Sequence, residues 1–126
     1  MTTQNIVQAP SVEVSKYEQL PSLFATYIGK YCIVRTESAG VFAGVILATE
    51  ISQGVVSCKI AESRRMWSWQ GAFTLSELAT TGTKQPDKCK FPAPVPEEIV
   101  FDVIEVLRCT DIARQIIESV PITAAA

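Results

Sequence analysis

The fold is decided by residues 31–69, which read YCIVRTESAGVFAGVILATEISQGVVSCKIAESRRMWSW. Three runs rich in β-branched and other apolar side chains are separated by short turns of small and polar residues. The runs are Tyr31–Thr36, Val41–Glu50 and Val55–Trp69, and the turns are Glu37–Gly40 and Ser52–Gly54. This pattern predicts an antiparallel meander of three strands. Gly44 inside the second run indicates a bulge or the close approach of another group.

The flanking sequence adds helices and a further strand. Thr74 and Glu77 form a capping box, which predicts a short helix from Leu75 to Thr80 that ends at Gly82. The run Ile99–Arg108 alternates as a fourth strand, and Thr110 caps a last helix that continues to Ser119. Residues 83–96, with four prolines around Phe91, are expected to form a stiff loop.

These elements predict one α+β domain with an antiparallel β-sheet of four or more strands and two short C-terminal helices. Apolar spacing over Tyr17–Ile28 indicates a short N-terminal helix. We expect residues 1–15 to be a flexible arm, residues 16–122 the ligand-binding domain and residues 123–126 a frayed tail.

Composition narrows the classes of function. The 126 residues are 48% hydrophobic and carry a net charge of −2, which suits one folded domain and argues against a duplex nucleic-acid partner. The chain has no histidine, and its four cysteines are widely spaced. We therefore expect no catalytic residues, no metal and no cofactor. Without a signal peptide or a long apolar run, the chain is expected to be cytosolic and to have no membrane partner.

Two adjacent arginines and both tryptophans fall between Glu62 and Trp69. Strand alternation places Arg65, Trp67 and Trp69 on one face and Arg64 on the other. Guanidinium groups suit phosphate and indole rings suit a base, so the first face is a candidate nucleotide cradle. The alternative is that the tryptophans fill a core and the arginines form a solvated flank.

Three further residues are candidates for the same ligand. Arg35 ends an apolar strand, and the hydroxyl of Thr36 beside it offers a donor toward an anion. The alternative for Arg35 is a strand-end residue that points into water. Phe91 lies on the proline-rich loop, either to stack on a ligand or to cover a gap in the core.

Several of these motifs together resemble a known family. They are Ile33–Gly44, Arg64–Trp69 followed by Gly71-Ala72, Leu75–Ala79, Cys89-Lys90-Phe91 and Val103–Val106. Over residues 29–121 the chain is similar to the first-described type of Thoeris anti-defence sponge, a family of small phage and prophage proteins. The resemblance implies a non-enzymatic protein that sequesters glycocyclic ADP-ribose, the signal of bacterial TIR-domain enzymes, in the cytoplasm of the infected host. It also implies cyclic di- or trinucleotides of CBASS defence as ligands of a second site.

The resemblance assigns roles by position. Phe91 would stack on the adenine, Arg64 or Arg65 would hold the pyrophosphate, and Arg35 would suit a cyclic-nucleotide phosphate. Asp102 is a candidate for a polar contact to base or ribose. The family assembles as homo-oligomers, dimers or trimers of dimers, with ligands between subunits. The N-terminal region and the final three alanines depart from its pattern.

Two other classes of function stay open. The chain is also compatible with an inhibitor that binds a host protein through Trp67, Trp69 and the Pro92–Pro96 loop. A phosphodiesterase that degrades the signal would need a metal on its carboxylates. Intact release of a bound nucleotide distinguishes the sponge from the phosphodiesterase.

Overall fold

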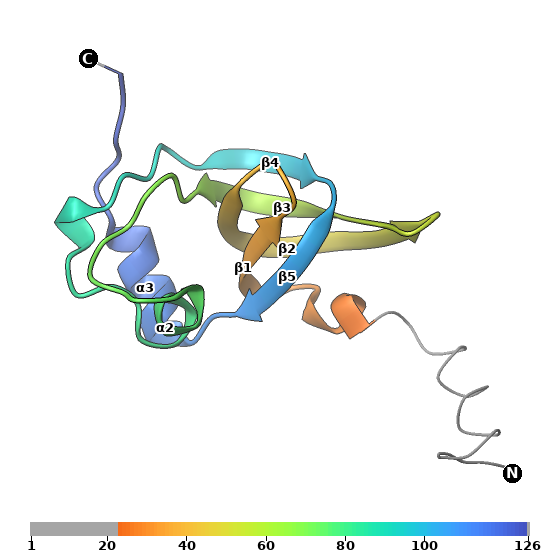
Figure 1. The fold of residues 1–126 in the computed structure, drawn as a ribbon, viewed down its shortest axis with the longest axis horizontal. Helices are drawn as coiled ribbons and strands as arrows, with labels where there is room; N and C mark the ends of the chain where they lie inside the picture. The colour runs from red at the N-terminus through yellow and green to blue at the C-terminus, as the bar shows by residue number, and fades with distance from the viewer. Residues whose placement is uncertain (1–22, 126) are drawn as a thin grey trace, which may run out of the picture.

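Five antiparallel strands form one sheet in the computed structural model, which describes residues 23–125 (Figure 1). The strands are β1 (Tyr31–Thr36), β2 (Val41–Ser52), β3 (Val55–Arg65), β4 (Val95–Val100) and β5 (Val103–Arg108). Their order in the sheet is β4-β3-β2-β1-β5. The predicted meander is confirmed, because β2 pairs with both β1 and β3.

Two strand predictions were wrong in extent. The third strand ends at Arg65 rather than Trp69, and only an isolated bridge between Ser68 and Lys90 follows it. The expected single strand Ile99–Arg108 is two strands, because Asp102 has a φ of 57° and reverses the chain. β4 begins within the expected proline loop, since Pro96 is tolerated on an edge strand.

The sheet curls on itself. β4 and β5 are its opposite edges, yet only Phe101 and Asp102 connect them. Two residues span about 10 Å at most, so the two edges must approach one another at this corner. Figure 1 shows the chain turning directly from β4 into β5. Inside the curl lies a core of alternate strand residues: Cys32, Val34, Phe42, Ile46, Cys58, Ile60 and Val100.

Two helices pack against one end of the sheet, beside β1 and β5 (Figure 1). α2 (Leu75–Thr81) and α3 (Asp111–Ser119) lie beside each other and enclose a second core with the outward residues of β1 (Figure 1). The capping prediction is confirmed, since the Thr74 hydroxyl accepts the Glu77 N–H at 3.1 Å. The Glu77 carboxylate in turn accepts the Phe73 N–H at 2.8 Å.

Short 3₁₀ helices complete the fold. η1 (Leu23–Tyr27) replaces the end of the expected N-terminal helix, and η2 (Pro86–Lys88) lies in the proline-rich segment. The expected arm 1–15 and residues 17–22 of that helix lie outside the described residues. Within residues 23–125, no helix has the length and apolar character needed to cross a bilayer.

Gly44 is required by close packing between β2 and β3. The register shifts between Ala43 and Val45, and a Cβ at Gly44 would lie 2.5 Å from Ile60 Cγ2 and 2.7 Å from the Ala61 carbonyl oxygen. The predicted bulge and close approach are confirmed. Gly44→Ala is expected to lower the free energy of unfolding by about 1–3 kcal/mol, measured by urea denaturation.

A matched glycine elsewhere serves as the control. Gly54, in the β2–β3 turn, has a φ of 82° and open space around its Cα. Asparagine tolerates this conformation, so Gly54→Asn should change stability by about 0.5 kcal/mol or less. Equal effects at the two positions would contradict the packing explanation for Gly44.

Buried thiols make the fold sensitive to alkaline pH. Burial raises the pKa of Cys32 to about 11 and that of Cys58 and Cys109 to about 12, from an ordinary value of 9.0. Above pH 9 the unfolded thiols ionise first, so this stabilisation is complete below pH 9 and is lost as pH rises through 11–12. Urea unfolding between pH 8 and 11 should show falling stability. Cys58→Ala should show a shallower fall, and an unchanged slope would contradict this origin.

Candidate functional site

The segment after β3 displays one tryptophan to solvent. Arg64 and Met66 are buried, whereas Arg65 is half-buried and Trp67 is 74% exposed, so the predicted alternation holds as far as Trp67. Neither of the two predicted roles, a nucleotide cradle or the filling of a core, describes both tryptophans. Trp69 packs partly against the core, while Trp67 lies almost free.

Backbone pairing on both sides holds Trp67 in place. The Met66 N–H donates to the Val41 carbonyl at 2.8 Å. On the other side, the Lys90 N–H donates to the Ser68 carbonyl at 2.8 Å, and the Ser68 N–H donates back at 3.3 Å. The indole is therefore exposed on an anchored segment, which lowers the entropy lost when a ligand stacks on it.

Two clefts meet at Arg65 and Trp67, which line both of them. The first, of about 290 Å³, is otherwise lined by Ser38, Ala39, Gly40, Val41, Met66 and Trp69. The second, of about 340 Å³, is otherwise lined by Lys90, Pro92, Thr123, Ala124 and Ala125. We call these clefts and the two shared residues the Arg65–Trp67 surface.

Arg65 is held in place by contacts to three residues. Its Nη1 donates to the Ala39 carbonyl at 2.5 Å, and its Nη2 lies 3.8 Å from the Glu98 carboxylate. The guanidinium also lies 4.5 Å from the centroid of the Phe42 ring. Its side chain remains 40% exposed, so part of its positive charge faces the clefts. Lys90 adds a second cation, with no ion pair to any residue in 23–125.

Arg64 points to the opposite side and holds the fold together. Three of its guanidinium N–H groups donate to carbonyls: Nε to Pro92 at 3.0 Å, Nη1 to Ile117 at 3.0 Å and Nη2 to Phe91 at 3.3 Å. The residue is 4% exposed, and burial lowers its pKa. Arg64 thus ties β3 to α3 and to the proline-rich segment, and most of its donors are already used.

Phe91 does not present a face for adenine. It is fully buried in the core under α2 and α3, with the Arg64 guanidinium 5.5 Å from its ring centroid. Backbone contacts to Ile122 and Thr123 cover its segment. The structure thus places Phe91 in the core, which was the alternative for this residue, and its stacking on a ligand stays a prediction.

Thr36 does not serve as a free donor either. It is 5% exposed, and its hydroxyl donates to the Gly40 carbonyl at 2.8 Å and accepts the Ala39 N–H at 2.9 Å. Both bonds stabilise the β1–β2 turn that lines the first cleft. In this structure the Thr36 hydroxyl serves the turn, and its contact to a ligand stays a prediction.

Arg35 and Asp102 lie apart from the Arg65–Trp67 surface. Arg35 is paired with Glu105 at 2.9 Å on the exposed surface. It shares a face with Val41, whereas Arg65 shares the opposite face with Phe42. Asp102 lies at the β4–β5 corner, where its carbonyl accepts the Glu37 N–H at 2.9 Å. The structure thus brings Arg65 and Trp67 together on this surface and Arg64 and Phe91 together in the core, while Arg35 and Asp102 lie apart from both pairs.

Sequence reasoning missed Lys90 and gave little weight to Arg114. Lys90 gave a weak signal as the cation next to Phe91. Arg114 looked like a surface residue, yet its guanidinium lies 4.8 Å from the Tyr31 ring centroid. Together with Arg64, Arg114 and Tyr31 line a separate cleft of about 330 Å³.

The Arg65–Trp67 surface offers an exposed indole for stacking and the positive charge of Arg65 and Lys90. Among the described residues, no three His, Cys, Asp or Glu side chains are grouped so that they could hold a metal ion. A family model described as "Domain of unknown function (DUF6948)" matches residues 29–117, which is more than half of the chain. No curated protein and no solved structure matches the chain.

Proposed function

The chain belongs to the family described as a domain of unknown function (DUF6948), and we propose that it binds a cyclic ADP-ribose-type nucleotide signal and sequesters it without cleaving it. The observation that carries the proposal is Trp67, a 74% exposed indole on an anchored segment, with Arg65 and Lys90 around it. Bases stack on exposed indoles, and the two cations suit the pyrophosphate of such a signal.

The shape of the surface supports a ligand that straddles Trp67. Trp67 lines both clefts, of about 290 and 340 Å³, and each is close to the lower limit for a small-molecule site. A dinucleotide-sized ligand would fill parts of both clefts and remain open to solvent on one side. A second copy of the chain would close that side, in keeping with a homo-oligomeric sponge.

The resemblance to the Thoeris anti-defence sponges supplies the biological setting. We propose that the protein acts in the cytoplasm of an infected bacterium, where it lowers the concentration of glycocyclic ADP-ribose. Binding of CBASS cyclic oligonucleotides at a second site is part of the same proposal. Of the earlier candidate residues, the surface retains Arg65 and Trp67 for direct contacts.

Capture followed by release tests sequestration. The protein is mixed with glycocyclic ADP-ribose or a cyclic trinucleotide, passed through a size-exclusion filter and heated to release bound ligand, which is identified by chromatography. We expect the ligand to be retained with the protein and released chemically intact. Serum albumin, treated in the same way, provides the control for nonspecific retention.

The other outcomes identify the alternatives. Recovery of linear or shortened products would show a phosphodiesterase and contradict sequestration. Passage of every nucleotide through the filter would reject the proposal and favour an inhibitor of a host protein, to be sought with Trp67 as its contact residue.

A further inference from the structure

The cleft between β1 and α3 gathers charged side chains around Tyr31, a largely buried residue. It is lined by Tyr31, Val45, Glu62, Arg64, Pro94, Arg114, Glu118, Val120 and Ile122. It shares no residue with the two clefts of the Arg65–Trp67 surface. The cleft and the Arg65–Trp67 surface lie on opposite sides of the end of β3, because the neighbouring side chains of Arg64 and Arg65 point in opposite directions.

Tyr31 has an unused hydrogen-bonding group in this cleft. The residue is 7% exposed, and no residue within 23–125 forms a hydrogen bond with its hydroxyl. Burial raises its pKa, so the group stays a neutral donor and acceptor at physiological pH. The hydroxyl oxygen is not among the buried polar atoms that lack a partner, so it reaches the cleft and is free to bond a ligand oxygen there.

The charges of the cleft are arranged by depth. Arg64, 4% exposed, is the most buried of these charged residues, and its hydrogen bonds within the described residues all go to neutral carbonyls. Glu62 is exposed at the rim, and Glu118, whose side chain is 52% exposed, pairs there with Arg114 at 3.2 Å. The two arginines and two glutamates of the cleft have no net formal charge. Its interior, at Arg64, is positive, and its rim carries both carboxylates. Such a gradient favours a dipolar ligand over a polyanion.

The backbone at the rim also departs from ordinary geometry. Glu62 has a φ of 50°, which is uncommon for a residue with a side chain. It occupies the bulge opposite Gly44, and that conformation places its carboxylate on the cleft. Within 23–125, Glu62 forms no ion pair.

We propose that this cleft is a separate binding site for a small zwitterion. The anionic end of the zwitterion meets Tyr31 and Arg64, and its cationic end meets Glu62. The connecting carbon chain would pack against Val45, Val120 and Ile122. The rim carboxylates repel a nucleotide pyrophosphate, so this site is independent of the proposed signal-binding surface.

Binding of 6-aminohexanoate, compared with its two halves hexanoate and hexylamine, tests the proposal. Chemical shifts of the arginine Nε–H groups are followed by NMR as each compound is titrated. We expect saturable shifts at Arg114 and Arg64 with 6-aminohexanoate, and an affinity at least about tenfold higher than for either half. Equal binding of hexanoate, or no saturable shift with any of the three, would overturn the proposal.

Variants then test each end of the site. Tyr31→Phe removes only the unpartnered hydroxyl, so the fold should persist while affinity falls about threefold to tenfold. Glu62→Gln should weaken 6-aminohexanoate but leave hexanoate unchanged or tighter. Lys88→Gln, a charge change on η2 outside the cleft, is the control. Unaltered affinity in both Tyr31→Phe and Glu62→Gln would overturn the assignment of the two ends.

Discussion

Arg64→Gln is expected to lower the free energy of unfolding by about 3–5 kcal/mol, because each buried acceptor left without a donor costs about 1–3 kcal/mol and the shorter side chain leaves a gap in the core. Arg64 is 4% exposed and donates to carbonyls of Phe91, Pro92 and Ile117. Glutamine is too short to reach all three carbonyls and carries no charge. The variant would leave buried acceptors without donors and would create a gap beside Phe91.

Equilibrium urea unfolding, followed by circular dichroism, measures this effect. Arg35→Gln is the matched control, because Arg35 forms an exposed pair with Glu105. Exposed pairs contribute about 0–1 kcal/mol, so the control should remain near the wild type. If Arg64→Gln and Arg35→Gln lose the same small amount, the structural role of Arg64 is wrong. Arg64 would then be available to a ligand as the family resemblance implies.

Trp67→Ala is expected to weaken binding of glycocyclic ADP-ribose about 5- to 150-fold, since stacking of one base on an aromatic side chain contributes about 1–3 kcal/mol. Trp67 is 74% exposed and forms part of both clefts. The loss of its side chain should therefore change stability by only about 0.5 kcal/mol. Isothermal titration calorimetry measures the affinity, and thermal unfolding verifies the fold.

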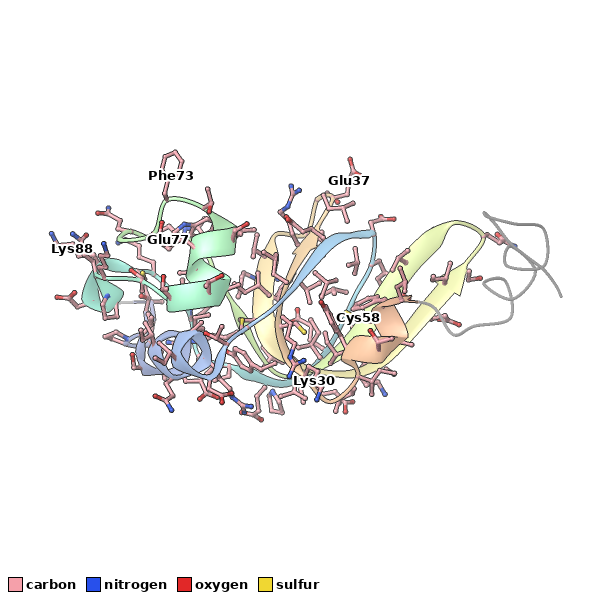
Figure 2. All side chains as sticks on the ribbon, turned by 90° about the horizontal axis from the view of Figure 1, so that it is seen from below. Lys30, Glu37, Cys58, Phe73, Glu77 and Lys88 are labelled. Carbon is pink, nitrogen blue, oxygen red and sulfur yellow. The ribbon has the colours of Figure 1, made fainter. Side chains whose placement is uncertain are left out.

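Phe73→Ala provides the matched control for Trp67→Ala. Phe73 is 92% exposed and lines none of the described clefts. Figure 2 shows its ring pointing away from the body of the protein, near Glu77. Binding should be unchanged in this variant. A similar loss in both variants would indicate nonspecific adhesion to exposed aromatics, and no loss at Trp67 would place the ligand elsewhere.

Local patterns predicted much of the fold. The turns, the first two strands and the capping box of α2 follow from short-range chemistry, and each is present. The division of residues 95–108 into two strands was missed, because it depends on pairing with β3 and β1, which are distant in sequence. The positive φ of Asp102 could not be recognised in the sequence, because apolar and polar residues alternate through that segment as in one strand.

The site was harder to predict than the fold. Alternation correctly separated Arg64 from Arg65, but it did not tell which side would be covered by helices. Because α3 and the proline-rich segment cover the Arg64 side, Arg64 and Phe91 are buried and Arg65 and Trp67 line the open clefts. The Thr36 hydroxyl was expected to bond an anionic ligand, but it donates and accepts hydrogen bonds within the β1–β2 turn.

The most direct test of nucleotide binding at the Arg65–Trp67 surface uses the two tryptophan side chains themselves. With only Trp67 and Trp69 in the chain, indole ¹⁵N labelling gives two NMR signals, which Trp67→Phe assigns. Titration with glycocyclic ADP-ribose should shift the Trp67 signal strongly and to saturation, with a smaller change at Trp69. If calorimetry shows saturation while the Trp67 signal stays in place, the nucleotide binds elsewhere and the proposed surface is wrong.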